Sequence, residues 1–148
     1  AVFWWPGTIK PDVIMNAATT MDLFPTFSAL AGIPMPKGKI YDGYDLSKVI
    51  DGTGSSERDV VFYYRGTRVF AVRKGEFKAH FITKTAYGVM DEKVLDQPLL
   101  FNLNHDPAEQ YNLAKEYPEI ISEIRNVLRD HLNTLTEVEN QHEKIIRK

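Results

Sequence analysis

Four histidines, His80, His105, His131 and His142, are the side chains of this sequence best suited to proton transfer or metal binding. None stands four residues from another, so no helical face offers the histidine pair that zinc sites use. His131 and His142 fall on the polar side of a predicted C-terminal helix or beyond it, where we expect solvated surface. His105 occupies a predicted turn at 104–107.

His80 carries the strongest functional signal of the four. It lies in a predicted strand at 77–83, where alternation places Lys78, His80 and Ile82 on the same face. One interpretation is a half-exposed histidine that hydrogen-bonds a neighbour; the other is a histidine on the sheet face that meets a substrate pocket. A single histidine is a weak signal, so periodicity alone favours the first interpretation.

Other sources of catalysis are scarce in this chain. The sequence contains no cysteine, which excludes a thiol nucleophile, a disulfide and a thiolate metal site within it. It also lacks a glycine-rich phosphate loop, an HExxH zinc motif and a GxSxG nucleophile elbow. Asp42 and Asp45 place two carboxylates in one short segment, but without further oxygen ligands a turn before a helix explains them better than calcium does.

The composition is that of an ordinary globular protein, since 43% of the 148 residues are hydrophobic and 26% are charged. The net charge of −2 argues against a nucleic-acid partner. No run approaches the roughly 20 apolar residues that span a bilayer, so no membrane partner is expected. Residues 1–5 follow no basic residue and do not resemble a signal peptide; they open in mid-element, which predicts a piece of a longer protein.

The first part of the chain should form the edge of an α/β layer. Residues 1–5 form a continuous apolar run that ends at Pro6-Gly7, which predicts a strand buried on both faces. A helix is predicted over 20–32, with Phe27 and Leu30 among the side chains that face a core. A strand followed by a helix is typical of such a layer.

A change of pattern marks a boundary in the middle of the chain. Residues 33–58 are rich in glycine, proline, aspartate and serine, and they hold one predicted short helix at 46–50. We therefore divide the chain into residues 1–45, the edge of a larger α/β domain, and residues 46–148, a second unit.

The second unit is predicted to be an antiparallel sheet covered by a helix. Its β-rich segments, separated by turn signals, are 60–64, 69–72, 77–83 and 98–103, with a polar excursion at 84–97. A long helix begins at Pro118 and should pack across one face of the sheet. Its apolar stripe consists of Ile120, Ile121, Ile124, Val127, Leu128, Leu132 and Leu135.

Taken in order, these segments resemble the end of a sulfatase of the arylsulfatase A and N-acetylgalactosamine-6-sulfatase kind. Six pieces in the right order over about 110 residues make chance agreement very small. They are Phe3-Trp4-Trp5-Pro6-Gly7, Thr20-Met21-Asp22-Leu23-Phe24-Pro25-Thr26 with Ala29-Leu30-Ala31-Gly32, Asp42-Gly43-Tyr44-Asp45-Leu46-Ser47, Phe62-Tyr63-Tyr64-Arg65-Gly66, Lys78-Ala79-His80-Phe81, and Leu100-Phe101-Asn102-Leu103 followed by Asp106-Pro107-Ala108-Glu109.

The resemblance implies an α+β fold, with residues 1–45 as a strand–helix remnant of an alkaline-phosphatase-like α/β domain. It also implies a parent enzyme that hydrolyses sulfate esters with calcium and a formylglycine made from Cys or Ser in a C/S-x-P-x-R motif. This sequence contains no such motif, and the family's calcium ligands lie upstream of the matching segments. We therefore expect no catalytic residue, metal ligand or cofactor in this chain, and no hydrolysis by the chain alone.

In such enzymes the C-terminal unit helps to wall the active-site cleft, which makes His80, Thr83, Lys84 and Tyr87 candidates for substrate binding. His80 carries the specific match, because Lys-Ala-His-Phe coincides as a block. Three alternatives stay open: a structural module that touches no substrate, a part of a related phosphodiesterase or phosphatase, and a stand-alone carbohydrate-binding module.

The remaining expectations concern the parent enzyme and its surroundings. The resemblance points to a sulfated glycan as substrate, a missing N-terminal catalytic domain as partner, and a periplasmic or secreted location. Because residues 1–32 would have packed on that domain, we expect a bare apolar surface and possible self-association through it.

Overall fold

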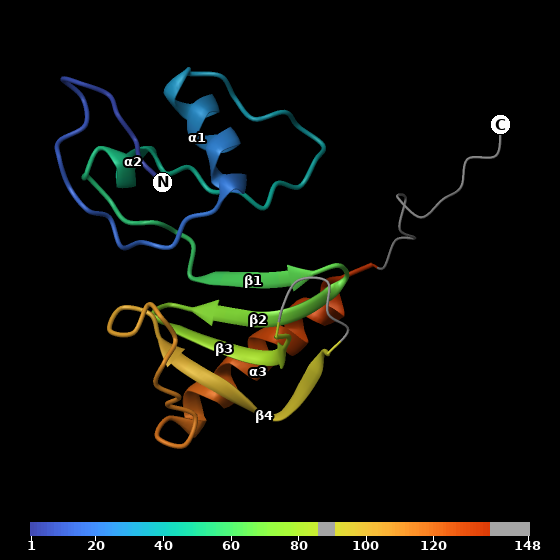
Figure 1. Cartoon of the computed structure of the whole chain (residues 1–148). Coiled ribbons are helices and arrows are strands. Elements are labelled where there is room, and N and C mark those ends of the chain that lie inside the picture. Colours follow the sequence, from blue (N-terminus) through green and yellow to red (C-terminus); the bar gives the residue numbers. More distant parts are fainter. Residues whose placement is uncertain (86–90, 137–148) are drawn as a thin grey trace.

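The computed structural model describes residues 1–85 and 91–136. The elements in chain order are η1 (Thr20–Asp22), α1 (Leu23–Leu30), α2 (Ser47–Ile50), β1 (Val60–Arg65), β2 (Arg68–Lys74), β3 (Phe77–Thr83), β4 (Lys93–Asn102) and α3 (Pro118–Thr134). Figure 1 shows α1 and α2 on one side of β1, and α3 lying along the sheet.

The four strands form one antiparallel sheet in the order β1-β2-β3-β4, so the predicted meander is confirmed. Gly66 and Gly75 lie in the two tight turns with φ of 60° and 56°, a conformation that costs glycine little. The polar excursion predicted at 84–97 is wrong in its last part, because β4 already begins at Lys93. Val94 pairs with Ile82 there, since strand pairing uses the backbone and an edge strand tolerates polar side chains.

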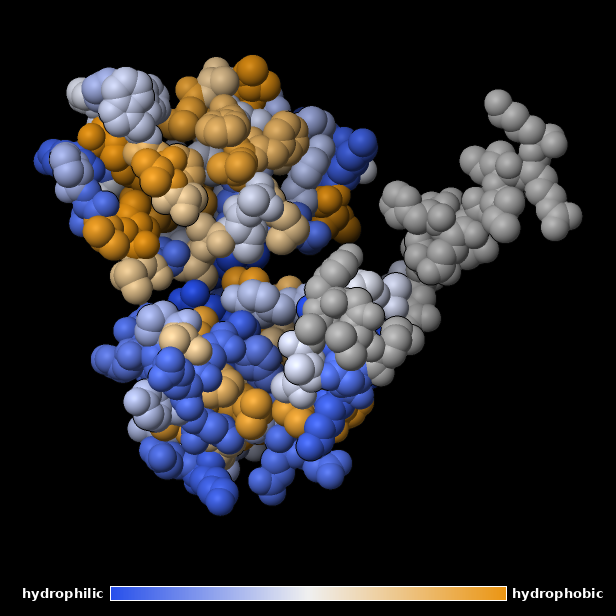
Figure 2. All heavy atoms as spheres, viewed as in Figure 1, coloured by the Kyte–Doolittle hydropathy of each residue, from blue (hydrophilic) through white to orange (hydrophobic). Residues whose placement is uncertain are grey.

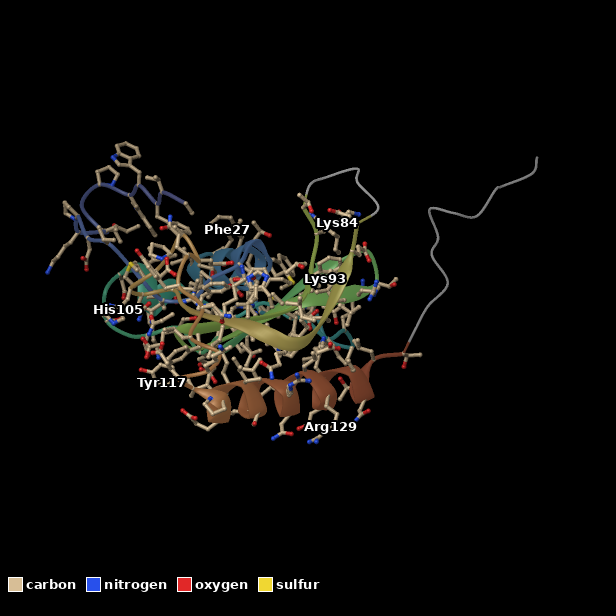
Figure 3. All side chains as sticks on the ribbon, turned by 60° about the horizontal axis from the view of Figure 1, so that its bottom comes forward. Phe27, Lys84, Lys93, His105, Tyr117 and Arg129 are labelled. Carbon is tan, nitrogen blue, oxygen red and sulfur yellow. The ribbon has the colours of Figure 1, made fainter. Side chains whose placement is uncertain are left out.

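The core lies between the sheet and α3. Val72, Ala79 and Leu100 from three neighbouring strands meet Ile124 of α3, and all four are fully buried. Pro118 begins the helix, where its missing N–H costs nothing. Figure 3 shows the helix along one side of the sheet, with Arg129 on its outer side.

His131 does not lie on the solvated side of α3, so that prediction was wrong. Its ring stacks on Phe62 of β1 with centroids 3.7 Å apart, and its Nε2 lies 2.5 Å from the hydroxyl of Tyr64. His131 follows the buried Ile124 by seven residues, two helical turns, and therefore faces the sheet as Ile124 does.

Residues 1–5 do not form the predicted strand. A strand buried on both faces needs neighbouring strands for its backbone hydrogen bonds, and the sheet of the described residues contains only β1 to β4. The apolar side chains of this part are consequently bare: Trp4 is 84% exposed and Phe27 of α1 is 56% exposed. The expected apolar surface is thus present, and Figure 2 shows hydrophobic residues gathered on the part of the molecule that holds α1.

A buried ion pair ties the segments around α1 together. The Asp22 carboxylate pairs with the Arg58 guanidinium and also accepts hydrogen bonds from the backbone N–H groups of Thr19 (2.6 Å) and Tyr44 (2.9 Å). Arg58 in turn donates to the carbonyl of Asp42 at 2.7 Å. Hydrogen bonds and the Arg58 charge hold the pKa of Asp22 below its usual range, although burial alone would raise it. We call this cluster the Asp22–Arg58 clasp.

The short helix α2 packs on the N-terminal part of the chain. Its Val49 and Ile50, together with Leu46, form a small apolar cluster with Ile9, and α2 also contacts α1. The division of the chain between residues 45 and 46 stays a prediction. None of the described helices combines the length and apolar character needed to cross a bilayer.

Candidate functional site

The face of the sheet opposite α3 carries an open depression of about 440 Å³. Residues from β1 to β4 and from the loop after β4 line it: Tyr63, Tyr64, Arg65, Phe70, Ala71, Lys78, His80, Ile82, Thr83, Lys84, Leu99, Phe101 and Glu109. Its rim and floor thus combine cationic, aromatic and hydroxyl groups. Such a mixture suits a ligand that carries both a negative charge and hydroxyl groups.

Strand β3 contributes two of the polar groups that line this depression, Lys78 and His80. The predicted alternation is confirmed: Ala79 packs into the core under α3, whereas Lys78, His80 and Ile82 face the depression. The pairing of β3 with β4 shifts register between His80 and Ile82. Irregularities of this kind re-aim side chains and are frequent next to functional sites.

Glu109, from the loop after β4, joins the two β3 side chains. One carboxylate oxygen lies 2.6 Å from Nζ of Lys78, and the other lies 2.6 Å from Nε2 of His80. The Lys78 ammonium also lies 4.4 Å from the centre of the Tyr63 ring, within cation–π range. We call Lys78, His80 and Glu109 the Glu109 bridge.

The electrostatics of the bridge favour a neutral imidazole and an ionised carboxylate. Burial lowers the pKa of His80 below its usual value; Glu109 opposes that shift and Lys78 reinforces it. For Glu109, burial would raise the pKa, but the hydrogen bond from Lys78 and the neighbouring charges outweigh it and lower the pKa. Edge contact with Phe101, at 5.8 Å between ring centroids, further restrains the His80 ring.

The other predicted site residues lie at the end of β3. Thr83 and Lys84 both line the depression with His80. Nζ of Lys84 lies 3.5 Å from a carboxylate oxygen of Glu92, and Figure 3 places Lys84 beside the end of the sheet. Tyr87 lies outside the described residues. Substrate binding by these residues stays a prediction.

Sequence reasoning gave no role to Glu109, although Asp106-Pro107-Ala108-Glu109 was among the matching segments. The carboxylate of Asp106 accepts hydrogen bonds from the backbone N–H groups of Gln110 and Tyr111, at 2.7 and 2.8 Å. This fixes the loop that carries Glu109. The sequence shows only a glutamate in a predicted turn. No local pattern indicates that this glutamate contacts His80, 29 residues earlier in the chain.

The part of the chain that the structure describes brings together no calcium site. No group of three carboxylate, histidine or cysteine side chains comes together among residues 1–85 and 91–136. The Asp45 carboxylate accepts a hydrogen bond from the backbone N–H of Ser47 at 2.8 Å, as a turn before α2 requires. Asp42 contributes its carbonyl to the clasp.

Comparison with known proteins identifies the family. The family model described as "C-terminal region of aryl-sulfatase" matches residues 56–147. This match covers more than half of the chain, so the chain belongs to the family of aryl-sulfatase C-terminal regions.

Individual relatives agree with this assignment. Arylsulfatase A of Homo sapiens is 38% identical over 86% of the chain and 29% of its own length. N-acetylgalactosamine-6-sulfatase of Canis lupus familiaris is 33% identical over 91% of the chain and 30% of its own length. Among solved structures, the PsFucS1 sulfatase from Pseudoalteromonas sp. matches 88% of the chain and 28% of its own chain, with a TM-score of 0.75 and 25% identity. The chain thus spans less than a third of the relatives that it matches.

Proposed function

We propose that this chain is the C-terminal part of an enzyme that hydrolyses sulfate esters of glycans, and that the sheet face around His80 walls the substrate cleft. The single observation that carries the proposal is the Glu109 bridge, set in a depression on the face of the sheet that α3 leaves open. Membership in the aryl-sulfatase family supplies the reaction class.

Two features favour this role over the alternatives. The hydrogen bond to Glu109 alone would suit a structural histidine, but the His80 side chain also keeps 21% of its surface exposed and lines the depression, where a ligand can reach it. A stand-alone carbohydrate-binding module needs bare aromatic rings, whereas the Lys78 ammonium covers the Tyr63 ring. The relatives named above are sulfatases, which favours a sulfatase over a related phosphodiesterase or phosphatase as the parent enzyme.

We assign the catalytic chemistry to the part of the parent that precedes this chain. The family's formylglycine would supply the nucleophile, and its calcium would polarise the sulfate group. The chain itself holds neither cysteine nor a C/S-x-P-x-R motif. The purified 148-residue chain should therefore release no sulfate from an aryl sulfate or a sulfated glycan, whereas the full-length parent should release it from both. Sulfate release by the chain alone would contradict this assignment.

Replacing His80 tests the role of the sheet face. In the full-length parent, His80→Ala should lower kcat/KM for a sulfated glycan about tenfold or more, the effect of losing one hydrogen bond worth about 1.5 kcal/mol. His105→Ala is the matched control, because His105 is exposed in the turn after β4. Equal kinetics for the two variants, at equal thermal stability, would remove His80 from substrate binding.

The bare apolar surface around α1 suits the same parent. Because the relatives are more than three times as long as this chain, we propose that preceding residues cover Phe24, Phe27 and Leu30 in the full-length protein. Without that cover the chain should self-associate. Sedimentation that shows a monomer at all concentrations would argue against this.

Export of the parent to the periplasm or the medium stays a prediction, to be tested by fractionation.

A further inference from the structure

Glu109 adopts a backbone conformation that is costly for its residue type. Its φ is 55°, and it is the one non-glycine residue among residues 1–85 and 91–136 with a positive φ. For such a residue the left-handed conformation costs about 1 to 2 kcal/mol. Strain of this size persists where the surroundings fix the conformation, and such residues cluster at functional sites.

This conformation belongs to a residue whose carboxylate reaches both β3 side chains. Each carboxylate oxygen has one partner, Lys78 or His80, and Glu109 keeps 25% of its side-chain surface exposed. The exposed fraction is too large for a core ion pair. The two distances of 2.6 Å are nevertheless those of charge-assisted hydrogen bonds.

The contact with Glu109 decides which nitrogen of His80 carries the proton. An ionised carboxylate can only accept, so Nε2 must donate, and in the neutral imidazole Nδ1 is then a pure acceptor. A carboxylate that holds one nitrogen in this way orients the ring and fixes its tautomer. The groups that face His80 are Glu109, Lys78 and Phe101.

A sulfate group is a poor hydrogen-bond partner for the neutral His80 ring. Sulfate oxygens only accept hydrogen bonds, and the one N–H of the neutral ring is already engaged by Glu109. Lys78 pairs with Glu109 and lies over the Tyr63 ring, but its contacts do not give the imidazole a second N–H. A hydroxyl group, which can donate to Nδ1, fits the imidazole.

We propose that Glu109 is a positioning residue that holds His80 in the Nε2–H tautomer, so that Nδ1 accepts a hydrogen bond from a sugar hydroxyl rather than binding the sulfate. This inference rests on the proposed function, because it names the part of the substrate that the same site recognises.

Nuclear magnetic resonance of the 148-residue chain tests the positioning half without any activity. Long-range proton–nitrogen spectra, with the His80 signals assigned through His80→Gln, should show the Nε2–H tautomer above the titration midpoint. The Glu109→Gln variant should move the midpoint of His80 to lower pH, and Lys78→Gln should move it to higher pH. Glu123→Gln is the matched control, because Glu123 pairs with Lys74 at 2.9 Å and does not contact His80.

The opposite outcomes are equally clear. The positioning role would be overturned by the Nδ1–H tautomer in the unsubstituted 148-residue chain, or by an unchanged titration midpoint of His80 in both Glu109→Gln and Lys78→Gln. If Glu109→Gln fails to fold, the upward shift in Lys78→Gln and the tautomer itself still decide the question.

Kinetics of the full-length parent test the ligand half. If Glu109 acts through His80, adding Glu109→Gln to His80→Ala should cause no further loss of kcat/KM on a sulfated glycan. Additive losses would overturn the positioning role while leaving the proposed function intact. Unchanged kinetics in His80→Ala would remove the proposed role of the sheet face and the ligand half together, whereas the spectra report on Glu109 independently.

Discussion

The Asp22–Arg58 clasp and the Glu109 bridge use the same chemistry in different surroundings. Each is built on a carboxylate that pairs with a cation from a distant part of the chain, and Glu109 also binds the neutral His80 ring. Asp22 has no exposed surface and is fully hydrogen-bonded, whereas Glu109 and His80 keep about a quarter and a fifth of their side-chain surface exposed. The clasp can therefore only stabilise the fold, whereas the bridge can stabilise the fold and also contact a ligand.

The largest expected effect comes from breaking the clasp. Arg58→Met should lower the free energy of unfolding by about 3 to 5 kcal/mol, because it leaves the Asp22 carboxylate buried without its partner. Urea denaturation measures this. Arg68→Met is the matched control, because the Arg68–Glu92 pair is largely exposed and should contribute about 1 kcal/mol or less. Equal losses in the two variants would contradict the expected difference between a buried and an exposed ion pair.

A smaller loss is expected where the clasp depends on a close backbone approach. A Cβ on Gly43 would lie 2.1 Å from the carbonyl oxygen of Met21, so Gly43→Ala must displace backbone next to Asp22. We expect a loss of about 1 to 3 kcal/mol by urea denaturation. A Cβ on Gly54 would meet Lys48 alone, 3.0 Å from its Cβ and 3.8 Å from its carbonyl oxygen, so Gly54→Ala should cost less. A larger loss in Gly54→Ala would contradict this packing.

The pH dependence of stability should show a step near neutrality that comes from the bridge alone, whereas carboxylates of both clusters contribute at acidic pH. The folded pKa of His80 lies below the unfolded value of about 6.5, so its contribution is complete above that pH and decreases as the pH falls below it. The lowered pKa of Asp22 acts in the same sense, but its contribution decreases only below about pH 3.9.

Urea midpoints measured from pH 8 to pH 3 check this order. The step nearer neutrality should disappear in His80→Gln, and the acidic step should weaken in Arg58→Met. Stability that rises as the pH falls from 7 to 5 would contradict the sign derived for His80.

The smallest effect should come from the bridge itself. Glu109→Ala should lower the free energy of unfolding by about 1 kcal/mol, because its ion pairs are partly solvated and the variant keeps the strained backbone. Denaturation of Glu123→Ala, on the exposed side of α3, gives the reference. A loss as large as that of Arg58→Met would mean that the bridge is mainly structural.

The sheet was predictable from the sequence because its signals are local. Alternation in 77–83 and the turn glycines Gly66 and Gly75 specify strands and hairpins within a few residues of each other. The strand predicted at residues 1–5 failed because an apolar run predicts a buried strand only if neighbours exist to pair with it.

The candidate site was predictable only in part. Alternation along β3 identified the face that His80 occupies, and that face lines the depression. The bridge depends on Glu109, which joins His80 across 29 residues through a loop with a positive φ, and the clasp joins Asp22 to Arg58 across 36. Contacts of this range depend on tertiary packing, which no local pattern records.

Substrate selectivity of the full-length parent tests the central claim most directly. If the open sheet face contacts the sugar, His80→Ala should lower kcat/KM for a sulfated glycan about tenfold or more while changing that for a small aryl sulfate much less. Equal losses on both substrates, or no loss on either, would contradict a role of His80 in contacting the glycan.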